Sequence, residues 1–310
     1  MLIKRKAPIF NYLIRGNIMA TLIGYAIPLT TPMPGINQQA DHTYVRTADG
    51  RGVWGCWGRS DGGSEICRGS GSSKQADCYS QPWGTSGIIY GVTGVCHQTA
   101  NRILYPARVI VSSAHGYWLS SLVYGTYGDI AGWAAQRLRC YWTHGDKAMK
   151  AQLKAAPEEE ANVKLAAPQS REDLDYITEI LALYEEAPQA PEKFSAKEGT
   201  APAFLNRELE IAIKIKLGKQ MDTGKTEAAI RFQNELHQDL NKLVDELYSG
   251  EISPAVYANQ ANQLFNKKFK LIGTEIGKDN YQKLFAIAPG VKLSLINPDV
   301  MTKPYKVIDM

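Results

Sequence analysis

Cys96 has sequence surroundings that could make a thiol reactive. The apolar run Ile88–Tyr90 before it predicts a short strand, the glycines and threonine of 91–94 predict a tight turn, and a segment of helical character follows. A helix N-terminus carries about half a positive charge and unpaired N–H groups, so a thiol there should ionise more easily. The same N–H groups could hold a developing oxyanion. The pattern therefore predicts a nucleophile, and the alternative is a small buried cysteine that fills space.

A thiol nucleophile needs a base within hydrogen-bond reach, and the histidines of the chain supply two candidates. His97 follows Cys96 directly, so on a helix it points about 100° away. His237 belongs to the other half of the chain. His42 and His115 remain as candidate bases. A third hypothesis is that neither is catalytic, because a lone histidine is usually structural.

The two candidate bases sit in different predicted elements. His42 opens the run His42–Thr47, which is followed by an Asp-Gly turn signal at 48–50 and a second β-like run at 51–57. This pattern predicts a β-hairpin that begins with the histidine. His115 comes after the β-like run Arg108–Ser113, which could return the chain to the thiol. Gln98 and Asn101 could hold the oxyanion or a substrate amide, or could cap local backbone.

A histidine at the head of a hairpin, an Asp-Gly turn and a later cysteine that opens a helix resemble a circularly permuted NlpC/P60-type papain-like domain over residues 20–145. The resemblance implies a small antiparallel sheet packed on helices. It also implies that Cys96 is the nucleophile and His42 the base. Related domains cleave or form amide, thioester or ester bonds through an acyl-thioenzyme, so the resemblance implies a thiol hydrolase or acyl transferase that uses no cofactor.

The composition divides the chain into two halves. All tryptophans and cysteines lie between residues 54 and 142, and residues 1–150 carry 15 basic and 7 acidic groups against 20 and 24 in the rest. Such a shift predicts two separately built units. We expect an α+β domain over 19–146, an Ala/Pro/Glu-rich linker with one helix over 147–203, a helical bundle over 204–300 and a tail over 301–310.

The helices of the second half are predicted from their apolar stripes and caps. Apolar residues recur at helical spacing from Leu236 to Leu247, and Gly250 should end that helix. Ser253 and Pro254 should begin the next, and a shorter helix should cover 280–285. We expect the stripes to form the core of a small antiparallel bundle, which could also bind a protein partner.

Charge and cysteine spacing exclude some classes of protein. The net charge of +4 comes from the first eighteen residues, which we interpret as an extension without a role in the fold, and the remaining 31 basic and 31 acidic residues balance. No concentrated basic face for nucleic acid is expected, and no apolar run is long enough for a membrane span. Cys56, Cys67 and Cys78 could form a metal site with a histidine, although close cysteine pairs are absent, or could contain a disulfide. The compartment is not fixed: a cytoplasmic location is the default, and secretion stays open.

The leading prediction is a cysteine-dependent hydrolase or acyl transferase that acts on an amide-type bond in a peptide or peptidoglycan-like substrate. The competing prediction is a non-enzymatic interaction protein, in which the Gly/Trp-rich half is a binding module and Cys96 a buried thiol.

Overall fold

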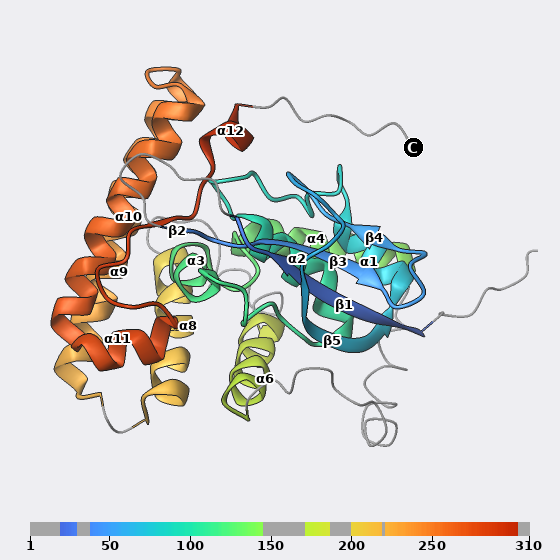
Figure 1. The fold of residues 1–310 in the computed structure, drawn as a ribbon, viewed down its shortest axis with the longest axis horizontal. Helices are drawn as coiled ribbons and strands as arrows, with labels where there is room; N and C mark the ends of the chain where they lie inside the picture. The colour runs from blue at the N-terminus through green and yellow to red at the C-terminus, as the bar shows by residue number, and fades with distance from the viewer. Residues whose placement is uncertain (1–18, 30–37, 145–170, 187–199, 219–220, 303–310) are drawn as a thin grey trace, which may run out of the picture.

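The computed structural model describes residues 19–29, 38–144, 171–186, 200–218 and 221–302. In these ranges a small antiparallel sheet with its own helices lies on one side of the molecule and the C-terminal helices lie on the other (Figure 1). The fold is thus mixed α and β, as the sequence predicts. The predicted extension 1–18, linker residues 147–170 and 187–199, and the tail from 303 lie outside the described residues.

The sheet holds the segment that begins with His42. Its strands lie in the order β4-β3-β1-β5, with bounds β4 Val53–Trp54, β3 His42–Thr47, β1 Met19–Ile27 and β5 Ser64–Ser72. The central strand β1 pairs antiparallel with β3 and β5, and Ile27 lies opposite His42. A Cβ at Gly24 of β1 would lie 2.6 Å from Cys67 Sγ and 3.2 Å from Leu104, so glycine allows helix α2 (Cys96–Leu104) to lie close to the sheet.

The predicted hairpin with His42 at its head is confirmed. Strands β3 and β4 pair antiparallel, with Val45 opposite Trp54. The turn between them is held by Thr47 Oγ1, which donates to Asp49 Oδ1 at 2.6 Å. Gly50 has a φ of 72°, the left-handed conformation that glycine adopts without strain.

Two other predicted strands are wrong. Ile88–Tyr90 lies in a series of turns and forms only an isolated bridge between Tyr90 and Gly94. Arg108–Ser113 follows the 3₁₀ helix η1 (Tyr105–Ala107), and Arg108 has a φ of 55°, which breaks an extended chain. Both apolar runs are mostly buried in the core without a strand partner. Short apolar runs predict burial, and they do not predict the backbone form.

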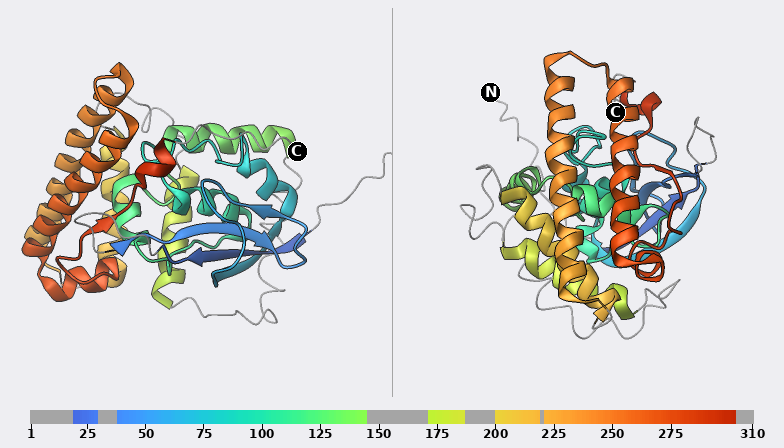
Figure 2. Two further views of the ribbon diagram at one scale, coloured as in Figure 1. Left: turned by 45° about the horizontal axis from the view of Figure 1, so that its top comes forward. Right: turned by 90° about the vertical axis from the view of Figure 1, so that its left-hand side faces the viewer.

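The C-terminal half is helical as predicted. Its helices are α6 Arg171–Glu186, α8 Thr200–Lys216, α9 Thr223–Ser249, α10 Pro254–Ile276, α11 Lys278–Phe285 and α12 Pro298–Met301. The long helices α9 and α10 run side by side (Figure 2). Gly250 ends α9 with a φ of 79°, and Ser253 Oγ accepts the N–H of Val256 to begin α10.

These helices pack against the N-terminal half as well as against one another, and one hydrophobic core runs through both halves. Glu208 of α8 accepts the N–H and the hydroxyl of Thr126, each at 2.9 Å. Gln233 of α9 donates to the carbonyl of Leu122 in α3 (Tyr117–Tyr124). A second, two-stranded parallel sheet joins β2 (Gln38–Gln39) to β6 (Leu293–Ser294). The two halves are therefore in contact over several elements.

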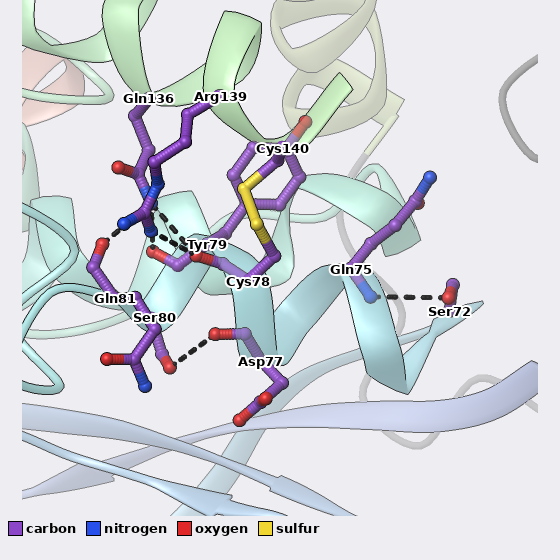
Figure 3. Close-up of a disulfide and its surroundings, with 10 residues drawn as sticks. All are labelled: Ser72, Gln75, Asp77, Cys78, Tyr79, Ser80, Gln81, Gln136, Arg139 and Cys140. Atoms are coloured by element: carbon purple, nitrogen blue, oxygen red, sulfur yellow. Dashed lines mark hydrogen bonds between the residues drawn. A yellow bond between two sulfur atoms is a disulfide. The ribbon is translucent and has the colours of Figure 1, made fainter. Parts of the chain in front are cut away.

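A disulfide joins α1 (Ser73–Ser80) to α4 (Ile130–His144). The bonded residues are Cys78 and Cys140 (Figure 3). Gln136 and Arg139 of α4 donate to the carbonyl of Cys78, each at 3.0 Å, and this carbonyl also accepts the N–H of Gln81 at the end of α1. Cys78 therefore pairs with a residue outside the Cys56, Cys67 and Cys78 set that the sequence suggested.

Candidate active site

Cys96 is the first residue of α2, as predicted, and Val95 is the N-cap. Valine has no side-chain acceptor for the first-turn N–H groups. Gln98 supports the helix start instead, because its Oε1 accepts the N–H of Val95 at 3.0 Å. The N–H groups of Cys96 and His97 lower the pKa of the Cys96 thiol, which is the predicted effect of a helix N-terminus.

The Cys96 sulfur lies against the edge of strand β3. Sγ donates to the carbonyl oxygen of Asp41 at 3.4 Å. The main chain and hydroxyl of Thr43 lower the pKa of the same thiol. The carbonyl of Asp41 and the N–H of Thr43 point to the same side of an extended chain, and β4 covers that edge only at Val45 and Arg46. The thiol therefore occupies the uncovered end of the strand that carries His42.

Burial dominates the ionisation of this thiol. Cys96 is only 8% exposed, and burial raises the pKa of its thiol by more than Thr43 and the first-turn N–H groups lower it. The residue is a neutral thiol at pH 7 in the free protein. The prediction of an acidified sulfur is therefore wrong for this structure, because desolvation outweighs the helix N-terminus.

His42 has a fixed tautomer. Its Nε2 lies 2.9 Å from the carbonyl oxygen of Arg59, which can only accept, so Nε2 carries the proton and Nδ1 is the basic nitrogen. A Cβ at Gly58 would lie 2.7 Å from Nε2, so the glycine lets the loop close over the ring. Burial lowers the pKa of His42, and the Arg59 carbonyl raises it by less. The imidazole is therefore neutral, the form that can accept a proton.

Cys96 and His42 line the same cavity, which has a volume of about 230 Å³. Apolar side chains from four separate parts of the chain form much of its wall: Ile27, Trp57, Tyr90, Val95, Leu295 and Val300. Asp41, Arg59 and Asn297 also line it. The arrangement offers a thiol, a neutral imidazole and a mostly apolar space beside them.

The alternative base, His115, is not among the residues that line this cavity. Its N–H donates to Asp41 Oδ2 at 2.9 Å, and its carbonyl accepts the N–H of Asp41 at 3.0 Å. The main chain of His115 thus fixes the residue before β3. Within the described residues, its Nε2 is buried without a hydrogen-bond partner.

Gln98 and Asn101, the predicted oxyanion or substrate residues, are fully buried parts of the core. Gln98 Nε2 donates to the carbonyl of Gly125 at 3.0 Å. Asn101 donates to the carbonyl of Thr126 at 2.8 Å and accepts the N–H of Val111 at 2.9 Å. Neither amide lines the cavity, so the predicted contact of these residues with substrate is wrong, and the alternative backbone-capping role holds.

Three features of the site were missed by sequence analysis. The Arg59 carbonyl belongs to the main chain, which no side-chain pattern marks. Thr43 reads as an ordinary strand residue. The cavity wall around Leu295 and Val300 comes from a segment far from Cys96 in the sequence. The polar residue Asn262, which binds the main chain of Leu295, stands beside apolar positions of a predicted helix and could have indicated a contact there.

The metal alternative is wrong for Cys78, because its sulfur is bonded to Cys140. Cys56 and Cys67 are free and buried, and burial raises the pKa of Cys67 to about 12. In the described ranges no three metal-ligating side chains gather in a way that could hold an ion.

No protein-family model matches this chain, and searches of curated proteins and of solved structures find no match. None of the helices described here has the length and apolar character needed to cross a membrane.

Proposed function

We propose that the protein is a cysteine-dependent hydrolase or acyl transferase that acts on an amide-type bond, with Cys96 as nucleophile and His42 as base. One observation carries the proposal: the thiol at the start of α2 and an imidazole of fixed tautomer line one cavity. The chain order, with the histidine hairpin before the cysteine helix, and the small antiparallel sheet support a papain-like fold of the permuted NlpC/P60 type.

The chemistry begins with a change in the hydrogen bond of the thiol. The S–H of Cys96 leaves the Asp41 carbonyl and transfers its proton to Nδ1 of His42, while Sγ forms a bond to the substrate carbonyl carbon. The resulting oxyanion faces the main-chain N–H of Cys96. When the C–N bond breaks, His42 gives its proton to the leaving amine and a thioester remains.

The second half of the reaction releases the acyl group. Water or an acceptor amine attacks the thioester carbon, His42 takes a proton from that nucleophile, and the proton returns to Sγ as the C–S bond breaks. Water gives hydrolysis and an amine gives transfer. We propose a peptide or peptidoglycan-like molecule as the substrate.

The test is the rate at which iodoacetamide modifies Cys96, located by peptide mass spectrometry. His42→Gln should slow the reaction about tenfold, because the base that takes the thiol proton is gone. His115→Gln is the matched control and should leave the rate unchanged. Hydrolysis of a panel of peptidyl amides should be lost in both Cys96→Ser and His42→Gln.

The low exposure of Cys96 and its raised pKa favour one other candidate, a non-enzymatic interaction protein. Equal, slow modification in the unaltered protein and in His42→Gln, with no amide hydrolysis, would support that candidate and contradict the enzyme.

A further inference from the structure

The cavity beside Cys96 has a wall that comes from the end of the described chain. Leu295 and Asn297 line it from the segment between β6 and α12, and Val300 lines it from α12 itself. We call Leu293–Met301 the C-terminal strap. In Figure 1 the strap is the dark red segment that passes beside β2 and ends with α12.

One edge of the strap is paired to the segment that leads into β3. Gln38 and Gln39 pair in parallel with Leu293 and Ser294. The N–H of Ala40 donates to the carbonyl of Ser294 at 2.9 Å. Ala40 directly precedes Asp41, whose carbonyl accepts the Cys96 thiol, so the strap and the thiol are held by consecutive residues.

The other edge is held by two asparagine side chains of α10. Asn262 Oδ1 accepts the N–H groups of Leu295 and Ile296, at 2.9 and 3.1 Å, and its Nδ2 donates to the carbonyl of Ile296 at 2.7 Å. Asn266 exchanges two hydrogen bonds with the main chain of Leu293, at 2.8 and 2.9 Å. Side-chain amides with both ends satisfied fix an extended chain in one position.

A third contact joins the strap to the loop before α2. The N–H of Asn297 donates to the hydroxyl of Tyr90 at 3.0 Å. A Cβ at Gly91 would lie 2.9 Å from Met301 Sδ and 3.0 Å from a methyl group of Ile296, so glycine is needed for this close packing. The strap is thus anchored on three sides around the cavity.

We propose that the C-terminal strap is a fixed wall of the substrate site, in which Leu295 and Val300 receive an apolar group next to the bond that Cys96 attacks. The proposal rests on the proposed function for the reaction itself, and the steric role of the wall does not depend on it. The three anchors make the strap part of the site and not a movable lid. The helical half of the protein therefore completes the site that the sheet half begins.

The test measures the modification rate of Cys96 by N-alkyl maleimides in the full chain, each rate divided by that of the same reagent with glutathione. Val300→Trp should fill the cavity and slow N-ethylmaleimide about tenfold. Val300→Ala should enlarge it and speed N-cyclohexylmaleimide more than N-ethylmaleimide. Val256→Trp, at an exposed position of α10, is the matched control and should change neither rate.

A second comparison tests the apolar character of the wall. N-propylmaleimide should react faster with Cys96 than maleimidopropionic acid, a reagent of similar size that carries a charge. If both reagents react at the same normalised rate, the proposal that the wall receives an apolar group of the substrate is overturned. Unchanged rates in Val300→Trp and Val300→Ala, or no modification of Cys96 in any variant, would overturn the wall.

The same measurements in a His42→Gln background separate this proposal from the proposed function. In that background, Val300→Ala should change the modification rate of Cys96 by the same factor as in the unaltered protein, because a steric effect needs no base. If His42→Gln does not slow the modification of Cys96 but Val300→Ala still changes its rate, the wall is supported and the proposed enzyme is contradicted.

Discussion

At the scale of single residues, Cys96 and His42 are both neutral before substrate binds. Burial raises the pKa of the thiol and lowers the pKa of the imidazole, so a resting thiolate–imidazolium pair is disfavoured. In His42→Gln, where only the free thiolate reacts, we expect the rate of Cys96 modification by iodoacetamide to rise about tenfold per pH unit from pH 6 to 8. In the unaltered protein we expect a shallower rise, because neutral His42 takes the thiol proton. The same dependence on pH in both proteins would contradict this prediction.

Thr43 should tune the thiol, because its hydroxyl and main chain are what lower the pKa of Cys96 most. Thr43→Val keeps the shape and removes the hydroxyl, so the pKa of Cys96 should rise further and iodoacetamide modification at pH 7.5 should slow about threefold. Thr43→Ser keeps the hydroxyl and is the control. The measurement is a titration of thiolate absorbance in a Cys56→Ser, Cys67→Ser background, and equal values in the two Thr43 variants would refute the assignment.

Residue types in the sequence predicted Cys96 and His42 but not their ionisation. The helix N-terminus has the predicted sign of effect on the sulfur, and the desolvation that outweighs it comes from contacts with Asp41, Thr43 and neighbouring segments. Such burial depends on residues far apart in the chain. Local spacing therefore finds candidate groups, and only the folded chain sets their pKa values.

At the scale of elements, helix α2 depends on a side chain that resembled a catalytic group. Gln98 accepts the N–H of Val95 and donates to the carbonyl of Gly125, both in the core. Gln98→Ala should lower the free energy of unfolding by about 2–4 kcal/mol, because it leaves buried polar groups unpaired. Gln263→Ala, at an exposed position of α10, should change it by less than about 0.5 kcal/mol.

Urea unfolding of Gln98→Ala and Gln263→Ala measures this difference in the free energy of unfolding. If Gln98→Ala unfolds like Gln263→Ala but loses amide hydrolysis, Gln98 acts on the substrate and the structural assignment fails.

Elements with strong local signals were predicted well. The hairpin after His42 has its Asp-Gly turn, and α10 begins and α9 ends at the predicted cap residues. The runs Ile88–Tyr90 and Arg108–Ser113 lack such signals, and most of their apolar residues are buried without sheet pairing. The strap was not predicted, since its anchors, Asn262 and Asn266, reveal their role only when the extended segment lies beside them.

At the scale of the whole molecule, the shift in composition suggested two separate units, and the structure joins them through buried polar groups in one core. Glu208 of α8 illustrates this, because its partners Thr126 and Tyr184 come from different parts of the chain. The composition of each half indicates which secondary structures it forms. It does not indicate whether the apolar faces of the two halves are buried against each other.

The buried carboxyl of Glu208 should give the joined fold a distinctive dependence of stability on pH. Burial raises the pKa of Glu208 to about 7, above its ordinary value, so the folded state holds the proton more tightly than the unfolded state. The stability from this group is fully present below pH 4.5 and is lost as pH rises through 7. His97 and His237 act in the opposite sense. Their pKa values are lowered to about 3 and about 4, so their contribution is lost as pH falls below 6.5.

Glu208→Gln removes the first of these opposed effects and leaves the histidines in place. The free energy of unfolding at pH 7.5 minus that at pH 5 should therefore be more positive in Glu208→Gln than in the unaltered protein, by about 2 kcal/mol. Glu210→Gln, two residues further along α8 at an exposed position, should leave the difference unchanged. Urea unfolding at both pH values measures it. If Glu208→Gln and Glu210→Gln give the same difference, Glu208 does not hold a proton in the folded protein at pH 5, and the joint between the two halves contains an ionised carboxylate instead.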